Sequence, residues 1–382
     1  MSRISFKCKK PPCLFVELAQ CHERQKRFSD ARKYLQEALR LNPVDVVAMN
    51  SMGRVSLDEG DMDTARKWFA KVIEIDSSDY YAINLMGQTY FAEKNLVAAR
   101  EWFRKTLEID PQEAVALKLM GKTYLEEGNT VEARRWFDKT IKIQPEDIIA
   151  PSLMGQTYLA EGDTSAAREW FLKAWEINKK NVVVYNLMGQ TYLIDGNTPS
   201  AMKWFKGALE INPKSAVAQN LMGQLFLMEG RPQLARTWFN KLLKNNIKDA
   251  MLFNFMAQTF IMEGNYEMAG EWIDRALKID PKNTIANLWL TFILIKEDKL
   301  SEAKKKTYEV ISREFSIPAF ILLFIISPSD FKSVIQLLEG GQQEKINYLK
   351  LADNELELSD IFEREMRCQH LLNLKNLCLG AR

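Results

Sequence analysis

Histidine and cysteine are the residues of this sequence best suited to nucleophilic or metal chemistry, and they are few. The 382-residue chain contains His22, His370, Cys8, Cys13, Cys21, Cys368 and Cys378. The four of these between residues 8 and 22 could surround a zinc ion, but their spacing matches no common zinc module, and a small thiol packed in a helix explains Cys21 equally well. No two cysteines have the CxxC spacing, so we expect no metal site and no disulfide framework, as is typical of a reducing compartment such as the cytoplasm.

Patterns typical of catalysis and of cofactor binding are also missing from the sequence. An active site needs acids, bases or nucleophiles that converge, whereas the two histidines follow no regular spacing. The glycines form no phosphate-binding loop of the GxxxxGK[ST] type. We therefore expect a protein that is not an enzyme and that carries no cofactor.

A more regular set of polar residues consists of amide side chains four positions apart, which share one face of a helix. The pairs are Asn84 and Gln88, Asn186 and Gln190, Asn220 and Gln224, and Asn254 and Gln258. Asn50 and Gln156 take equivalent places beside a different partner, and Lys118 and Lys122 replace both amides of one pair. Amides offer donors and an acceptor, so such a row could pair with the backbone of an extended peptide of any sequence. The alternative is that these residues are solvated and similar only because the units were copied.

The element that positions these pairs is a repeat of 34 residues. Met-Gly recurs at Met52, Met86, Met120, Met154, Met188 and Met222, each followed by glycine. Trp-Phe recurs at Trp68, Trp102, Trp136, Trp170, Trp204 and Trp238, with an alanine three residues before each tryptophan. A turn such as Gly128-Asn129 lies between the two markers, where glycine can end one helix and asparagine can cap the next. Each unit is therefore predicted to be a helix, a turn and a second helix.

The repeat resembles the tetratricopeptide repeat family, whose pattern is a small residue, an aromatic, a glycine turn, an alanine, an aromatic and a proline. One unit matches it with Gly121, Tyr124, Gly128, Ala133, Phe137 and Pro145. The resemblance covers about nine units between residues 12 and 317, with atypical first and last units, after an extension of residues 1–11. It implies an all-α fold, an α-solenoid in which helix-turn-helix units stack into a right-handed superhelix.

The resemblance also implies a function. The helix face that carries the amides lines the concave surface in this family, which often holds extended peptides, and the row resembles the asparagine ladder of the O-linked N-acetylglucosamine transferase repeat domain. We therefore expect a non-catalytic scaffold or adaptor that binds an extended segment of a protein partner. The expected peptide-binding residues are Asn50, Asn84, Gln88, Lys118, Lys122, Gln156, Asn186, Gln190, Asn220, Gln224, Asn254 and Gln258. A self-assembling homo-oligomer, or a non-catalytic subunit of a larger complex, would give the same sequence pattern.

Nucleic acid and membrane are not the expected partners. The tryptophan row could stack bases, but 52 basic residues nearly balance 50 acidic ones. An arginine row also runs with acids seven residues earlier, such as Glu59; its members are Arg66, Arg100, Arg134, Arg168 and Arg236. We expect local neutralisation of these charges on a solvated surface. The strongest apolar run, Ile317 to Ile326, has about half of the roughly 20 residues that a membrane-spanning helix needs.

Residues 318–382 follow a different pattern. Ser327-Pro328 is a helix start signal, Gly340-Gly341 interrupts the chain, and an acidic stretch precedes leucines with helical spacing after Leu371. We favour a helical cap for the end of the solenoid. The alternative is a regulatory segment that folds back on the concave groove.

Overall fold

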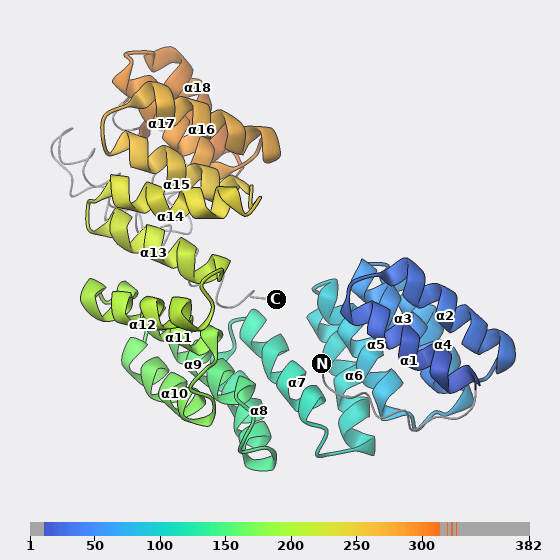
Figure 1. The fold of residues 1–382 in the computed structure, drawn as a ribbon. Helices are drawn as coiled ribbons and strands as arrows, with labels where there is room; N and C mark the ends of the chain where they lie inside the picture. The colour runs from blue at the N-terminus through green and yellow to red at the C-terminus, as the bar shows by residue number, and fades with distance from the viewer. Residues whose placement is uncertain (1–10, 314–318, 320–321, 324–325, 327–382) are drawn as a thin grey trace. The chain divides into compact units, whose positions relative to one another are not determined.

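The protein is helical throughout the part of the chain that the computed structural model describes, residues 11–313, 319, 322–323 and 326. Helices alternate with short turns in pairs, each pair matching one predicted repeat (Figure 1). No strand occurs in these residues. The all-α solenoid predicted from the 34-residue period is therefore confirmed. The predicted extension and most of residues 318–382, including the expected cap, lie outside the described residues.

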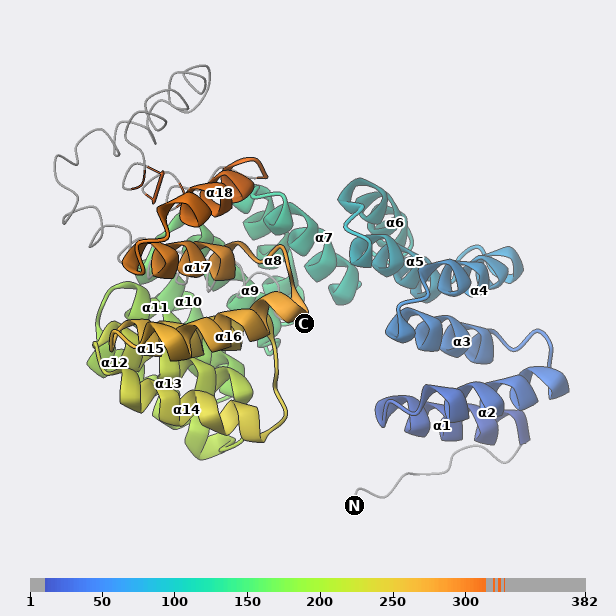
Figure 2. The same cartoon turned by 90° about the horizontal axis from the view of Figure 1, so that it is seen from above.

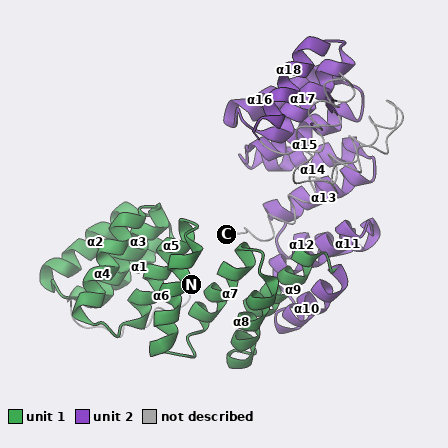
Figure 3. Ribbon diagram, turned by 180° about the vertical axis from the view of Figure 1, so that it is seen from behind, with its two compact units in different colours: residues 1–163 green, residues 164–382 purple. Residues whose placement is uncertain are grey.

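The chain divides into two compact units, residues 1–163 and residues 164–382 (Figure 3). The first unit contains α1 (Pro11–Arg24), α2 (Phe28–Leu41), α3 (Val46–Glu59), α4 (Met62–Ile75), α5 (Tyr80–Ala92), α6 (Leu96–Ile109), α7 (Ala114–Glu126), α8 (Thr130–Ile143) and α9 (Ile149–Glu161). The second contains α10 (Thr164–Ile177), α11 (Val182–Ile194), α12 (Thr198–Ile211), α13 (Ala216–Met228), α14 (Pro232–Lys244), α15 (Ala250–Ile261), α16 (Tyr266–Ile279), α17 (Thr284–Lys296) and α18 (Leu300–Ile311). Figure 2 shows how neighbouring hairpins, such as α1–α2 and α3–α4, lie beside each other within a unit.

The turns follow the predicted capping chemistry. The side chain of Asn95 accepts a hydrogen bond from the backbone N–H of Ala98 at the start of α6, and Asn129 does the same for Glu132 at the start of α8. Gly128 takes a left-handed conformation, with a φ of 80°, between α7 and α8. These local contacts make each hairpin turn at the same place in the repeat.

Close packing of the two helices in a hairpin explains why glycine follows methionine in most repeats. A Cβ atom on Gly189 would lie 2.3 Å from a ring carbon of Phe205, which is fully buried. The three repeats that lack this glycine also lack the phenylalanine: Ala19 stands with Leu35 and Ala257 with Ile273, each pair in one buried cluster, and Thr291 stands with Thr307, both buried. The volumes of the two positions are therefore matched along the chain.

The arginine row is neutralised by acids of the following repeat. Arg66 pairs with Glu93 of the following repeat at 2.8 Å, not with the acid seven residues before it, and its guanidinium lies 5.0 Å from the centre of the Tyr90 ring. The same inter-repeat ion pair joins Arg32 to Glu59, Arg100 to Glu127, Arg134 to Glu161, Arg168 to Asp195 and Arg236 to Glu263. We term this contact the arginine clasp. The predicted local neutralisation is therefore made between repeats, because their stacking brings together residues 27 positions apart.

Two junctions between described repeats of the second unit, α12–α13 and α16–α17, lack the arginine clasp, the latter because Gly270 stands at the arginine position. Met202 of α12 stands where arginine stands elsewhere, and Glu229 at the end of α13 pairs instead with Arg231 of its own repeat, 3.2 Å away. The guanidinium of Arg231 also lies 5.2 Å from the centre of the Phe226 ring. The α12–α13 junction is held by apolar packing, in which Met202 contacts a buried cluster that includes Phe205 and Leu221.

The tryptophan row packs within the solenoid. On each of five second helices, a lysine three residues later lies over the indole, from 4.4 Å between Lys71 and Trp68 to 3.4 Å between Lys241 and Trp238. Trp102 also packs against the buried cluster that contains Phe69 and Met86. These contacts agree with a packing role for the indoles.

Candidate functional site

The predicted peptide-binding residues all lie on the first helices of their repeats, but they differ in exposure. Seven of them are buried, with 1% to 6% of their surface exposed: Asn50, Asn84, Asn186, Gln190, Gln224, Asn254 and Gln258. The other five are half-buried: Gln88, Lys118, Lys122, Gln156 and Asn220. The row is therefore less open to a ligand than its polarity indicates.

The first residue of several pairs holds the start of the next repeat. The side-chain N–H of Asn254 donates to Oδ1 of Asn283 at 2.9 Å, and that of Asn50 donates to Oδ2 of Asp79 at 3.4 Å. Asp79 in turn accepts a hydrogen bond from the backbone of Ala82 and so caps α5. Asn84 and Lys118 make the equivalent contacts to Glu113 and Asp147. These side chains thus have a structural role, because they join one first helix to the cap of the next.

The amide carbonyl groups of the same residues are not used within the described residues. The side-chain oxygens of Asn50, Asn84, Asn186, Asn220, Asn254 and Gln258 are buried and have no hydrogen-bond partner there. A buried acceptor without a donor is costly, but these oxygens have almost no accessible surface, so a ligand donor could reach them only after the side chains move. The N–H groups of a peptide backbone are donors of this kind.

A cleft of about 350 Å³ opens beside the row in the first unit. It is lined by Gln20, Val46, Val47, Asn50, Ser51, Arg54, Asp79 and Tyr81. Of the predicted residues only Asn50 contributes to it. Arg54 takes the place of glutamine in the pair and donates to the hydroxyl of Tyr81 at 3.2 Å, while it is also ion-paired with the buried carboxylate of Glu23.

Two lining residues, Val47 and Tyr81, belong to a row that the sequence analysis missed. Its members stand at the same repeat position on α3, α5, α7, α9, α11 and α13, three residues before Asn50 or its equivalent, and are 42% to 57% exposed: Val47, Tyr81, Val115 and Ile149 in the first unit, and Val183 and Val217 in the second. We term them the apolar row. Because residues three apart share a helix face, the apolar row runs beside the amide positions. The row could have been predicted from the sequence, because an apolar residue recurs at this position with the same 34-residue period.

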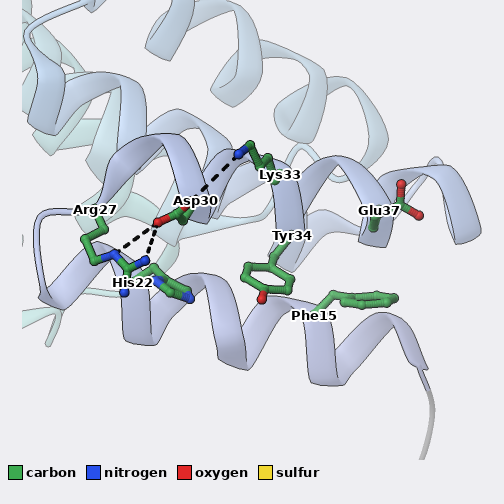
Figure 4. A pocket seen from close by; sticks show the side chains of 7 residues that line it. All are labelled: Phe15, His22, Arg27, Asp30, Lys33, Tyr34 and Glu37. Atoms are coloured by element: carbon green, nitrogen blue, oxygen red, sulfur yellow. Dashed lines mark hydrogen bonds and ion pairs between the residues drawn. The ribbon is translucent and has the colours of Figure 1, made fainter.

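A second pocket, of about 410 Å³, lies on the first hairpin (Figure 4). Phe15 and His22 of α1 both face Tyr34 of α2, with ring centres 6.3 Å and 5.3 Å from it. Asp30 pairs with both Arg27 and Lys33, so the charges on its rim are compensated. This pocket contains none of the predicted peptide-binding residues.

The residues considered for metal chemistry do not come together in the described part of the chain. No group of three or more histidine, cysteine or acidic side chains there is placed to hold a metal ion. Cys21 is a free thiol, whereas Cys13 is disulfide-bonded, and Cys8 lies outside the described residues. The disulfide at Cys13 departs from the expectation of a chain without a disulfide framework, which rested on the absence of a CxxC pair and on the place of the cysteines near the two ends. Among residues 11–313, no helix is long and apolar enough to cross a lipid bilayer.

Comparisons with known proteins agree with the repeat architecture. Models of the tetratricopeptide repeat match residues 16–80, 56–123, 152–181, 182–215 and 252–283. A search of characterised proteins finds no match to the sequence. Among solved structures, a tetratricopeptide repeat protein from Parabacteroides merdae is 15% identical with a TM-score of 0.54, over 65% of this chain and 99% of that one. The Cut9–Hcn1 hetero-tetramer of the APC/C is 16% identical with a TM-score of 0.56, over 80% of this chain and 60% of that one. The matched segments cover more than half of the sequence, and the chain belongs to the tetratricopeptide repeat family.

Proposed function

We propose that the protein is a non-catalytic scaffold that binds an extended segment of a partner protein along the first helices of its repeats. Membership of the tetratricopeptide repeat family supports a protein-interaction scaffold in general. The observation that carries the finer proposal is the cleft of about 350 Å³, in which the amide of Asn50 lies beside the exposed side chains of Val47 and Tyr81. The cytoplasmic location stays a prediction.

The chemistry of this surface favours a strand-like ligand. The half-buried amides of Gln88 and Gln156 can pair with a peptide backbone without regard to sequence, whereas the apolar row offers contacts for alternate side chains of the same segment. Affinity would come from the backbone contacts and from apolar burial, and sequence preference from the apolar row. Homo-oligomers are the outcome expected if a second copy, not a peptide, covers this surface.

The test uses exposed residues, because the asparagines also hold the repeats together. Random 15-residue peptides are selected by display on the full chain, and their affinity is then measured for a Val47→Gln, Val115→Gln double variant. Each Val→Gln substitution removes about 1 kcal/mol of the binding free energy that comes from apolar burial against the peptide, so the affinity should fall about tenfold or more.

The matched control is Val97→Gln with Val131→Gln, which changes two equally exposed valines on α6 and α8. Peptide affinity should stay within about twofold of the unchanged protein. Equal losses in both double variants, or a selection that yields no binding peptide, would overturn the proposal. Concentration-dependent mass without peptide binding would favour self-assembly.

A further inference from the structure

The pocket on the first hairpin lies at a position where later repeats contact the helix before them. Phe15 and Tyr34, which line this pocket (Figure 4), stand 34 residues before Met49 and Trp68. Leu39 of α2, the second helix of the first repeat, packs with Trp68 against the buried cluster that contains Met49. The pocket therefore occupies, in the first repeat, the place at which the second repeat receives α2.

The same contact recurs along the chain. An apolar residue near the end of one second helix, which we term the anchor residue, shares a buried cluster or a ring contact with the aromatic residue of the next second helix. In the second unit the anchor residue is Trp175 of α10, whose ring centre lies 6.0 Å from that of Trp204 and 6.5 Å from that of Tyr185. In the first unit the anchor residues and their aromatic partners are Leu39 and Trp68, Ile73 and Trp102, and Leu107 and Trp136. In all these repeats a second helix covers the face that corresponds to the pocket.

The corresponding face of the first hairpin is more open. No described helix precedes α1. Phe15 is half-buried, whereas its equivalents Met49, Ile83 and Leu117 are only 2% to 7% exposed. Tyr34 is half-buried as well, and burial of the remaining apolar surface of these two rings is favourable. The α1–α2 hairpin thus presents the receiving half of the contact between repeats.

The polar residues beside the pocket indicate that this contact is mainly apolar. Gln25 stands where Glu59, the acid of an arginine clasp, stands one repeat later, so an arginine on an incoming helix finds no acid at that place. Asp30 is already paired with both Arg27 and Lys33. The incoming helix is therefore recognised by an apolar anchor residue and not by an arginine clasp.

We propose that the α1–α2 hairpin receives an amphipathic helix of a partner protein, which continues the stack by one second helix and places a leucine or isoleucine beside Phe15 and Tyr34. The interface between successive repeats supplies the template for this contact. The last described second helix of another copy is not free to take the place, because Ile311 of α18, at the anchor position, packs against a buried cluster that contains Leu322 and Leu323. The proposal is independent of the proposed function, because none of the predicted peptide-binding residues lines this pocket.

The probe is an acetylated, amidated peptide with the sequence of α2, residues 28–41, which carries the anchor residue Leu39. A lactam between its Lys33 and Glu37 holds the peptide helical, because so short a helix is marginal alone, and both residues are exposed in the protein. The full chain should bind this peptide, and Leu39→Ala in the peptide should weaken binding about tenfold or more. This change leaves the protein itself untouched.

Variants of the full chain locate the binding site. Phe15→Gln with Tyr34→Gln should weaken binding of the peptide about tenfold or more, whereas Tyr34→Trp, which copies the later repeats, should keep it. Leu14→Gln is the matched control, because Leu14 is an exposed apolar residue of α1 that does not line the pocket, and the affinity should stay unchanged. The bound peptide should also slow hydrogen exchange in α1 and α2.

Other results overturn the inference in distinct ways. Absence of binding, equal binding of the Leu39→Ala peptide, or slower exchange elsewhere instead of in α1 and α2 shows that this face receives no such helix. Binding that appears only after removal of residues 1–10 identifies that segment of the chain as the occupant. Concentration-dependent mass that the Phe15→Gln, Tyr34→Gln variant loses identifies a second copy. The Val47→Gln, Val115→Gln variant should bind the α2 peptide normally, so failure of this inference leaves the proposed function standing.

Discussion

Replacement of Gly189 by alanine should destabilise the α11–α12 hairpin, although alanine is the better helix former. The new Cβ would lie 2.3 Å and 2.5 Å from two carbons of the Phe205 ring, which has no exposed surface into which to move. Overpacking of this severity costs about 3 kcal/mol, and the higher helix propensity of alanine returns about 1 kcal/mol. We therefore expect a net loss of about 2 kcal/mol.

The chain offers both a control and a rescue for this substitution. Gly270 of α16 has no atom within 4 Å of an added Cβ, so Gly270→Ala should stabilise its helix by up to about 1 kcal/mol. Phe205→Ile added to Gly189→Ala copies the combination of Ala257 and Ile273 and should recover more than half of the loss. The rescue tests whether the clash, and not the backbone, causes the loss.

The assay is hydrogen exchange of the α11 and α12 amides, because repeat proteins open locally and a single free energy of unfolding does not describe the whole chain. Gly189→Ala should speed exchange in this hairpin about thirtyfold, which corresponds to about 2 kcal/mol. Urea unfolding followed by circular dichroism ranks the stabilities of the variants independently. Unchanged or slower exchange in Gly189→Ala, or a double variant less protected than either single one, would refute the packing argument.

Two further predictions concern the arginine clasp. Met202→Arg places a guanidinium where Glu229 of the next repeat can pair with it, so the α12–α13 junction should gain up to about 1 kcal/mol of stability. The gain should appear as slower hydrogen exchange at this junction, and added salt should reverse it. Faster exchange would show that the apolar contact of Met202 contributes more than the ion pair. The Thr130 hydroxyl and the Arg134 guanidinium lower the pKa of Glu161 in the folded protein. The stability that ionised Glu161 contributes to the fold is therefore fully present above about pH 4.3, the ordinary pKa of glutamate, and is lost as the pH falls through the folded-state pKa. The difference in urea midpoint between the unchanged protein and Glu161→Gln should therefore shrink between pH 7 and pH 3, and a constant difference would contradict this cause.

Features fixed within one repeat were predictable from the sequence, whereas features that depend on two repeats were not. Gly128 and Asn129 predict the turn between α7 and α8, because a left-handed glycine and a capping asparagine act on residues next to them in the sequence. The partner of Arg66 could not be predicted, because the period reveals equivalent positions but not how far one repeat shifts over the next.

The same limit applies to the candidate site. The sequence places Lys118 and Lys122 on one helix face, as the structure does, yet only the structure separates the paired lysine from the unpaired one. The apolar row was missed, because the sequence does not reveal which valines are exposed and single apolar residues are common on protein surfaces. Whether the twelve predicted residues bind a peptide stays a prediction.

The arginine clasp bears on how the number of repeats in this chain can change during evolution. It always joins an arginine to an acid 27 positions later, which belongs to the next repeat. Loss of the 34 residues from 80 to 113 would bring Glu127 to the position that Glu93 holds relative to Arg66, so the ion pair would form again across the new joint. A deletion whose length is not a multiple of 34 residues would separate these partners. Unequal recombination in whole repeats can therefore lengthen or shorten the protein without a compensating mutation. Selection for stability then favours insertions and deletions of whole 34-residue repeats.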